Sequence, residues 1–238
     1  ALVPRDARAG IDVRHPEALV AATHPFPPDP ATVAGYFEDK QAVLVGPGLA
    51  PGPAAENLVA AVCGGPMPVV LDAGALTVAA SRPDRFLPIL AGRMAAGLPP
   101  AVLTPHPGEF SRLAPDLDRT DPVASARTCA ARWGSVVVLK GAGTVVAAPD
   151  GRCAINTTGN DGLSKAGSGD VLAGLLSGLL AQGMDPWEAA LAAVCLHGMT
   201  ADAIARRSGR RSLLPGDLAP GFEAAFKEAG WEKDTWKG

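Results

Sequence analysis

Four short runs of consecutive, almost entirely apolar residues constrain the fold more than any other feature of this chain. They occupy residues 42–45, 68–71, 101–103 and 135–139. A strand that is apolar on successive residues must be covered on both faces, which is typical of parallel sheets. The segments between the runs are rich in alanine and long enough for crossover helices, at residues 53–63, 84–96 and 122–132. The pattern predicts a three-layer α/β/α domain with a mainly parallel central sheet.

The second half of the chain follows a different pattern. Residues 144–148 and 152–155 flank the turn Pro149-Asp150-Gly151, which predicts a β-hairpin. Helical patterns then dominate, at residues 169–182, 186–206 and 217–229. We see no internal repeat and no linker, so we expect residues 1–238 to form a single domain.

Composition excludes several classes of function. The chain has 238 residues, of which 47% are hydrophobic, 19% charged and 5% aromatic, with a net charge of −3, so it is long enough for a full globular core and lacks the basic, aromatic surface that nucleic-acid binding needs. The N-terminus has no basic stretch leading into an apolar one, and the longest apolar runs are broken by Gly, Gln and His. We therefore expect a cytoplasmic protein that neither spans nor binds a membrane.

Cysteine and histidine spacing argues against a metal site made by protein side chains alone. No two cysteines form a Cys-x-x-Cys pair, and most lie beside Ala or Val, as expected for reduced thiols in a core. The histidines show no ligand spacing with the cysteines or with one another. These residues are Cys63, Cys129, Cys153, Cys195, His15, His24, His106 and His197.

A loop of small residues that opens onto an apolar helix predicts an anion site. In Ala166-Gly167-Ser168-Gly169-Asp170, the glycines allow backbone N–H groups to converge, and the first helical turn adds unpaired donors and partial positive charge. Gly167, Ser168 and Gly169 are thus predicted to hold a phosphate. Asp170 would repel that phosphate as a passive neighbour, so we interpret it as a base that removes a proton from a group beside the anion.

Further candidate residues follow the four predicted strands, at the edge where an open α/β sheet binds ligands. The segments are Gly46-Pro47-Gly48, Asp72-Ala73-Gly74, Thr104-Pro105-His106-Pro107-Gly108-Glu109 and Lys140-Gly141-Ala142-Gly143-Thr144. We expect all four to line one pocket. Each also has a purely structural interpretation: a strand-exit turn for the first, a turn cap for Asp72, a helix start for Glu109 and a solvated side chain for Lys140.

Two residues of these segments favour ligand binding. His106 stands between two prolines, which fix the backbone and hold the imidazole at the end of the strand. Lys140 ends an apolar strand, where a cation is costly unless it emerges into a cleft that holds anions. The Gly-Ala-Gly-Thr sequence after Lys140 indicates a phosphate or nucleotide neighbour.

Four motifs in one order resemble those of the ADP/ATP-dependent NAD(P)H-hydrate dehydratases, metabolite-repair enzymes of the ribokinase-like superfamily. They are Thr104-Pro105-His106-Pro107-Gly108-Glu109, Leu139-Lys140-Gly141-Ala142-Gly143-Thr144, Gly159-Asn160 and Ala166-Gly167-Ser168-Gly169-Asp170-Val171-Leu172-Ala173-Gly174. The resemblance runs from about residue 42 to the last helices and implies a ribokinase-like fold. Residues 1–40 do not show the Gly- and Ala-rich strand and helix that family members carry before this point, so we expect that segment to be missing or diverged.

The resemblance also implies an activity, in which hydrated NADH or NADPH is dehydrated to the reduced cofactor while ADP or ATP is cleaved to AMP or ADP and phosphate. By family likeness, Gly48, His106 and Asp170 contact the hydrated dinucleotide, and Asp170 is the catalytic base. The adenine nucleotide is bound by Lys140, Gly141, Ala142, Gly143, Thr144 and Gly169. The resemblance further implies a magnesium ion on the phosphates, a homo-oligomer, and an NAD(P)H-hydrate epimerase as functional partner.

Two alternatives use the same loop. A ribokinase-like kinase acting on a vitamin-type alcohol would need the same anion site and base, although Pro105–Glu109 stands where such kinases tend to carry an Asn and Glu pair for magnesium. A nucleotide sensor without turnover would keep the pocket, and Asp170→Asn would leave its nucleotide binding unchanged.

Overall fold

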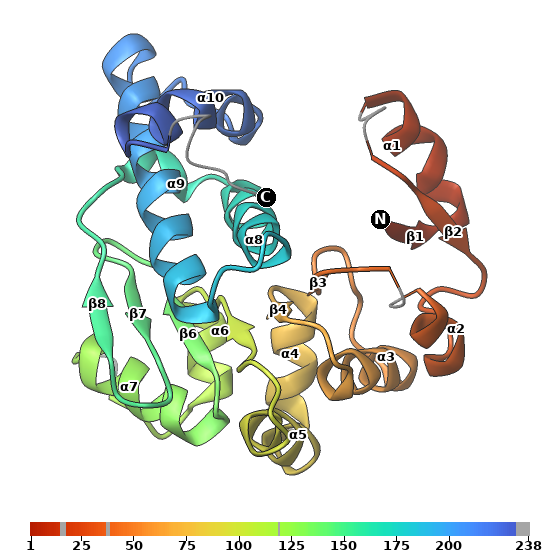
Figure 1. The fold of residues 1–238 in the computed structure, drawn as a ribbon. Helices are drawn as coiled ribbons and strands as arrows, with labels where there is room; N and C mark the ends of the chain where they lie inside the picture. Colours follow the sequence, from red (N-terminus) through yellow and green to blue (C-terminus); the bar gives the residue numbers. More distant parts are fainter. Residues whose placement is uncertain (15–17, 37–38, 119, 232–238) are drawn as a thin grey trace.

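A six-stranded sheet forms the centre of the computed structural model, which describes residues 1–14, 18–36, 39–118 and 120–231 (Figure 1). The strand order is β3-β4-β5-β6-β7-β8; the first four are parallel, and β7 and β8 continue the sheet antiparallel. The strands are β3 (Val43–Val45), β4 (Val69–Leu71), β5 (Val102–Leu103), β6 (Val136–Leu139), β7 (Val145–Ala147) and β8 (Cys153–Ile155). The predicted parallel strands and the predicted hairpin are confirmed.

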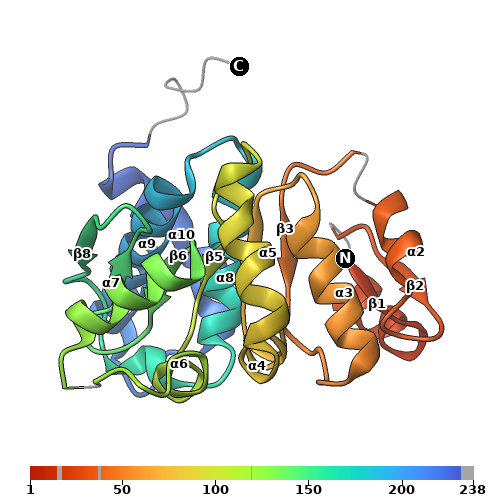
Figure 2. The same cartoon turned by 90° about the horizontal axis from the view of Figure 1, so that it is seen from below.

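Successive side chains of each strand feed two separate cores, which explains why the strands are apolar throughout. On β4, Val69 and Leu71 pack into one core, and Val70 packs into the other. The first core lies under α3 (Pro53–Gly64), α4 (Gly74–Ser81), α5 (Pro83–Ala95), α6 (Pro107–Leu113) and α7 (Pro122–Trp133). The second lies under α8 (Ser168–Ala181) and α9 (Pro186–Ser208). Figures 1 and 2 show these helix layers on either side of the sheet, as expected for the three-layer fold.

Helix α9 owes its apolar composition to its position. It is the one helix in the described part of the chain whose length and hydropathy would suit a membrane span, but 56% of that stretch is buried inside the structure. One side packs on the sheet beside α8, and its C-terminal half packs against α10 (Pro215–Glu228) through Ile204 and Leu218. The burial of α9 accounts for its hydropathy within the fold.

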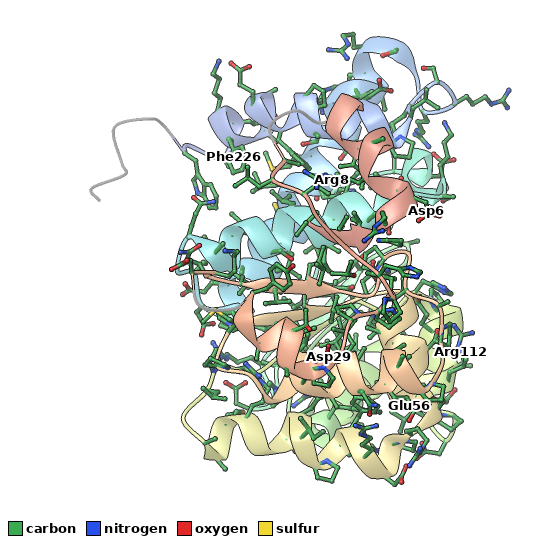
Figure 3. The ribbon with its side chains drawn as sticks, turned by 90° about the vertical axis from the view of Figure 1, so that its right-hand side faces the viewer. Asp6, Arg8, Asp29, Glu56, Arg112 and Phe226 are labelled. Carbon is green, nitrogen blue, oxygen red and sulfur yellow. The ribbon has the colours of Figure 1, made fainter. Side chains whose placement is uncertain are left out.

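Residues before β3 form a small unit with its own two-stranded parallel sheet, built from β1 (Leu2–Pro4) and β2 (Ala21–Thr23). The helices of this unit are η1 (Arg5–Ala7), α1 (Arg8–Arg14) and α2 (Pro30–Gly35). Figure 3 views this side, with Asp6 and Arg8 on the first elements and Asp29 at the start of α2. The segment therefore contains strands and helices that the sequence did not predict. Its two strands are only half-buried and include Pro4 and Thr23, so they lack the uninterrupted apolar runs of the central sheet.

Candidate functional site

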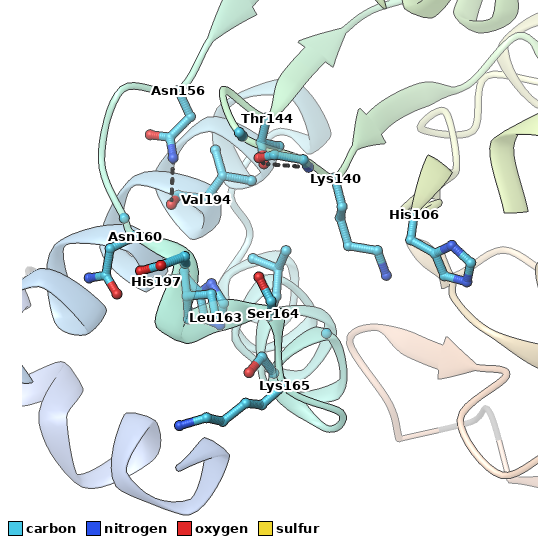
Figure 4. A pocket seen from close by; sticks show the side chains of 18 of the residues that line it. His106, Lys140, Thr144, Asn156, Asn160, Leu163, Ser164, Lys165, Val194 and His197 are labelled. Atoms are coloured by element: carbon cyan, nitrogen blue, oxygen red, sulfur yellow. Dashed lines mark hydrogen bonds between the residues drawn. The ribbon is translucent and has the colours of Figure 1, made fainter. Parts of the chain in front are cut away.

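A cavity of about 960 Å³ opens at the carboxyl ends of β4, β5 and β6 and extends to α8 and α9 (Figure 4). Three of the four predicted strand-end segments line it, through Asp72 and Ala73, through His106, Pro107 and Glu109, and through Lys140 to Thr144. Residues 155–161 and 163–170, Leu172 and the α9 residues Val194, His197 and Gly198 complete the wall. The cavity thus brings Asp170, His106, Lys140 to Thr144 and Gly167 to Gly169 together; their roles stay predictions.

The fourth segment does something else. Gly48 is exposed and is not among the residues that line the cavity, so the expectation that all four segments line it is wrong for Gly46-Pro47-Gly48. Gly46 instead packs against the turn after β4: it has φ +130°, its carbonyl accepts a hydrogen bond from Gly74 N–H at 3.2 Å, and a Cβ added to it would lie 1.7 Å from the Asp72 carbonyl oxygen. This segment supports the residue that follows β4.

The predicted anion loop has the expected form. Gly167 is the N-cap of α8 with φ 97°, a left-handed conformation that favours glycine, and it makes no side-chain capping bond. Asp170 lies in the first turn of α8. Gly169 faces the Lys140 side chain, and a Cβ added to it would lie 3.3 Å from Lys140 Nζ. The loop therefore places a helix N-terminus, a carboxylate and an ammonium group at one side of the cavity.

A buried carboxylate anchors that ammonium group. Asp72 is 2% exposed, and its Oδ1 accepts hydrogen bonds from Lys140 Nζ at 2.9 Å and from Thr104 Oγ1 at 2.8 Å. The Lys140 side chain is 19% exposed. Asp72 is therefore an ion-pair partner inside the site, and the interpretation of Lys140 as a fully solvated side chain is wrong.

The environment of Asp170 favours its protonated form more than water does. Partial burial raises the pKa of its carboxyl group, and the negative charge of Asp72 raises it further, while Lys140 acts in the opposite direction. A carboxyl group with a raised pKa is a stronger base once ionised. This electrostatic setting suits proton abstraction by Asp170.

His106 combines its two predicted interpretations. Its Nδ1 accepts hydrogen bonds from the N–H groups of Gly108 at 3.0 Å and Glu109 at 3.4 Å, and Glu109 Oε2 accepts one from His106 N–H at 2.8 Å. This reciprocal capping starts α6 and confirms that Glu109 lies in a first helical turn. Because Nδ1 is an acceptor, the neutral ring carries its proton on Nε2. The imidazole remains 54% exposed at the cavity wall.

The turn between β6 and β7 is closed by a side chain. Thr144 Oγ1 donates to the Gly141 carbonyl at 3.1 Å and lies 3.3 Å from the Gly141 N–H, which donates to it (Figure 4). Gly143 has φ +75°. The turn has a fixed shape, with the backbone of Gly141 to Gly143 exposed along the cavity.

Helix α9 holds the opposite wall. Asn156 Nδ2 donates to the Val194 carbonyl at 3.3 Å, and Thr158 Oγ1 donates to the Cys195 carbonyl at 3.0 Å (Figure 4). Gly198 makes this approach possible, since a Cβ there would lie 2.2 Å from Thr158 Oγ1. The turn-rich approach to the anion loop is therefore a fitted wall of the cavity.

His197 is a cavity residue that the sequence does not reveal. His197 is 6% exposed, and burial lowers the pKa of its imidazole to about 4, against a backbone hydrogen bond with Ser168 that raises it and a Lys140 charge that lowers it further. Within the described residues, its Nε2 and the buried Ser168 Oγ have no hydrogen-bond partner. In the sequence it stands in an apolar helical run, which does not show that its side chain faces a cavity.

A family model for NAD(P)H-hydrate dehydratases matches residues 3–221, almost the whole chain and including its first strands. The chain belongs to the NAD(P)H-hydrate dehydratase family. It is 39% identical over 211 residues to the ADP-dependent (S)-NAD(P)H-hydrate dehydratase of Neisseria meningitidis, which covers 86% of this chain and 69% of that protein. It is 43% identical over 213 residues to the bifunctional NAD(P)H-hydrate repair enzyme Nnr of Gloeobacter violaceus, covering 86% of this chain.

Solved structures of this dehydratase family share the fold. The Bacillus subtilis ADP/ATP-dependent NAD(P)H-hydrate dehydratase, co-crystallised with ATP/Mg²⁺, superimposes with a TM-score of 0.76 at 31% identity, covering 95% of this chain and 78% of that one. The resemblance inferred from the motifs and the ribokinase-like fold class are thereby confirmed. The chain spans between 32% and 39% of the length of the bifunctional relatives from Moorella thermoacetica and Gloeobacter violaceus.

The depressed pKa of His197 predicts an acid-sensitive fold for this dehydratase-family chain. The unfolded imidazole takes up a proton near its ordinary pKa of 6.5 and the folded one only near a pKa of about 4, so stability is fully present above pH 6.5 and falls as the pH drops toward 4. The loss attributable to His197 is about 3 kcal/mol. Denaturant unfolding of His197→Asn between pH 4 and 7 should show a flatter pH dependence than the parent.

The matched control is His24→Asn, since His24 is exposed. This variant should keep the parent's pH dependence. Identical slopes for the parent and His197→Asn would contradict the prediction.

Proposed function

We propose that this chain dehydrates hydrated NADH or NADPH to the reduced dinucleotide, with ADP or ATP cleaved to AMP or ADP and phosphate. Family membership supports the activity. The observation that carries it is the position of Asp170, in the first turn of α8 with a raised pKa, beside Lys140 and the glycine loop. The cavity of about 960 Å³ is at the upper end of the range of ligand sites, which suits two nucleotides.

The chemistry follows from the poor leaving ability of hydroxide. Asp170 takes the proton of the ring hydroxyl, whose oxygen attacks the terminal phosphoryl group and displaces AMP or ADP. The resulting phosphate ester then loses phosphate, which leaves with the electron pair of the C–O bond. Loss of a ring proton restores the double bond to which water had been added. Backbone N–H groups at Gly167, Ser168 and Gly169 would stabilise the negative charge on the transferred group.

The predicted binding roles extend this proposal to the rest of the cavity. Lys140, Gly141, Ala142, Gly143, Thr144 and Gly169 would bind the adenine nucleotide. His106, whose imidazole is 54% exposed at the cavity wall with Nε2 3.5 Å from Glu109 Oε1, would contact the hydrated dinucleotide together with Asp170. We assign Gly48 to the same substrate only if the substrate extends beyond the cavity wall, because Gly48 lies outside it.

The donor set fits magnesium that arrives on a nucleotide. Within the described residues, no three His, Cys, Asp or Glu side chains converge as a metal cage. Protein-bound magnesium keeps several waters and is commonly held through substrate phosphates. The turn at Gly141 to Thr144 and the α8 loop would hold the ion indirectly, by holding those phosphates. When bound, magnesium would share the charge of the phosphoryl groups.

The deciding experiment incubates the protein with hydrated NADH or NADPH and, in parallel reactions, with ADP or ATP. We expect recovery of absorbance from the reduced nicotinamide, with one phosphate released per dinucleotide. A panel of vitamin-type alcohols tests the kinase alternative in parallel. A phosphorylated alcohol without hydrate turnover would overturn the proposal, and nucleotide binding without any turnover would favour the sensor.

Thr144→Val should weaken nucleotide binding by about three- to tenfold, because the loss of one hydroxyl removes both hydrogen bonds that close the Gly141 turn. Thr144→Ser keeps the hydroxyl and should bind nearly as the parent does. Calorimetric titration with ADP checks both. Equal affinities of the valine variant and the parent would show that the turn does not contact the nucleotide.

The cellular setting is also part of the proposal. An NAD(P)H-hydrate epimerase would be the functional partner, and the bifunctional name of longer relatives supports a second repair activity nearby. A cytoplasmic location and a homo-oligomeric state follow from the family likeness. Size-exclusion chromatography with light scattering would test the oligomer.

A further inference from the structure

The turn that carries Asp72 is locked from several directions. Ala73, the next residue, has φ 47°, and it is the one non-glycine residue with positive φ in the described part of the chain. Such a conformation is costly for alanine and persists only where the surroundings enforce it. Gly46 and Gly74 enforce it here, since a Cβ on Gly46 would clash with the Asp72 carbonyl, and one on Gly74 would lie 2.0 Å from the Leu49 carbonyl. A strained turn therefore fixes the position of the Asp72 carboxylate.

Lys140 needs that carboxylate. Its ammonium lies beside Gly169 in the first turn of α8, where the partial charge of the helix is positive and disfavours a cation. The side chain is also mostly buried, which adds a desolvation cost. The 2.9 Å contact with Asp72 supplies the opposing charge, and Thr104 Oγ1 fixes the same carboxylate oxygen at 2.8 Å. Without Asp72, the ammonium would have little reason to stay at this helix end.

Three charged groups from distant parts of the chain therefore meet. Asp72 follows β4, Lys140 follows β6, and Asp170 lies in the first turn of α8. We propose that Asp72 is a positioning residue of the active site, which holds the Lys140 ammonium against the first turn of α8 beside the base Asp170. This proposal rests on the proposed function for its catalytic meaning and on the ion pair for its geometry.

The arrangement has a use in the reaction. Before proton transfer, one cation interacts with two carboxylates, since Lys140 is paired with Asp72 and its charge also favours the ionised form of Asp170. When Asp170 accepts the substrate proton, Asp72 keeps the ammonium paired, so the ammonium stays directed at the anion loop while phosphate charge develops there. The position of the ammonium then lets it stabilise the charge of the reacting phosphoryl group. The loss of Asp72 should therefore lower kcat more than it raises KM for the nucleotide.

Both partners also act on the titration of Asp170, in opposite directions. Asp72 favours the protonated carboxyl and Lys140 favours the ionised one. The other titratable side chains that line the cavity are His106, Glu109, Asp161, Lys165 and His197. Asp72→Asn should therefore move the titration midpoint of Asp170 to lower pH, and Lys140→Met should move it to higher pH. Opposite shifts would show that both charges act on Asp170, and the split between kcat and KM then tests the positioning role.

The test measures the Asp170 carboxyl by ¹³C NMR in the ligand-free protein, with Asp170→Asn to assign the signal. In parallel, kcat and KM for ADP are measured in the hydrate assay across pH. We expect opposite midpoint shifts for Asp72→Asn and Lys140→Met, and a fall in kcat of about tenfold to a hundredfold for Asp72→Asn, with KM for ADP within about threefold.

The possible results separate the positioning role of Asp72 from the proposed function. Unchanged or parallel midpoints, or a raised KM with unchanged kcat, would overturn the positioning role. Opposite shifts in a protein that has no hydrate activity would retain the ion-pair geometry and refute the proposed function instead. Thermal unfolding checks that the variants are folded, and if Asp72→Asn does not fold, Lys140→Met and Thr104→Val carry the test. Thr104→Val keeps both charges and removes one bond to Asp72, so it should lower kcat less and leave the midpoint near the parent's.

Discussion

Replacing Asp170 with asparagine is expected to lower the rate of hydrate dehydration by about a thousandfold while nucleotide affinity stays within about tenfold. Asparagine has nearly the same shape, so the first turn of α8 and its N–H groups remain in place. It cannot accept the substrate proton, and without that step the ring hydroxyl is a weak nucleophile toward phosphate. Steady-state kinetics with ADP and ATP, and calorimetric titration of each nucleotide, measure the two effects separately.

Asp161→Asn is the matched control, because Asp161 lines the same cavity but is exposed and pairs at 3.4 Å with Arg210. An exposed pair of this kind contributes little energy. The control should retain activity within about threefold of the parent. Activity of Asp170→Asn within a few-fold of the parent would mean that another group is the base.

Gly46→Ala should be the most damaging single methyl group that can be added near the site. The new Cβ would lie 1.7 Å from the Asp72 carbonyl oxygen and 3.0 Å from Ala75 Cβ, on a backbone with φ +130°. Neither the strand end nor the start of α4 can yield without moving the other, so we expect the free energy of unfolding to fall by about 3 kcal/mol or more. Urea unfolding gives the value.

Gly92→Ala is the matched control for Gly46→Ala. Gly92 lies in α5, is exposed, and has no heavy atom within 4 Å of an added Cβ, so Gly92→Ala should raise the free energy of unfolding by up to about 1 kcal/mol. If Gly46→Ala proves as stable as the parent, the close approach of β3's exit to the β4 turn is incorrect. If it folds, its activity should still fall, because the Asp72 turn must shift to admit the methyl group.

The spacing of apolar residues predicted the fold more completely than it predicted the site. The strands β3 to β6 were recognisable because burial on both faces leaves uninterrupted apolar runs, and α8 because a glycine loop meets a long apolar helix. Helices α4 and α6 have 8 and 7 residues, too few for a pattern to rise above the neighbouring turns. The short elements before β3 escaped notice for the same reason.

The site depended on contacts that no local pattern encodes. Asp72 and Lys140 are 68 residues apart, and their pairing follows from the order of strands in the sheet. A proline-framed histidine and a lysine at a strand end were visible locally, so His106 and Lys140 could be placed at the cavity. His197 could not, because an apolar helical run gives no sign of which side chain faces a cavity. The close contact of Gly46 with the Asp72 carbonyl oxygen likewise depends on the packing of one strand end against the next turn, which no local pattern encodes.

The hairpin of β7 and β8 joins two segments of the cavity wall, Lys140 to Thr144 and the residues from Ile155 onward. Its register pairs Val145 with Ile155, and the next bond runs from Asn156 N–H to the Thr144 carbonyl at 2.8 Å, so one wall begins where the other ends. Inserting or deleting a single residue in either strand would turn its side chains to the opposite face of the sheet. Side-chain substitutions can alter the lining of these two segments, whereas a change in chain length within the hairpin would also shift one segment relative to the other.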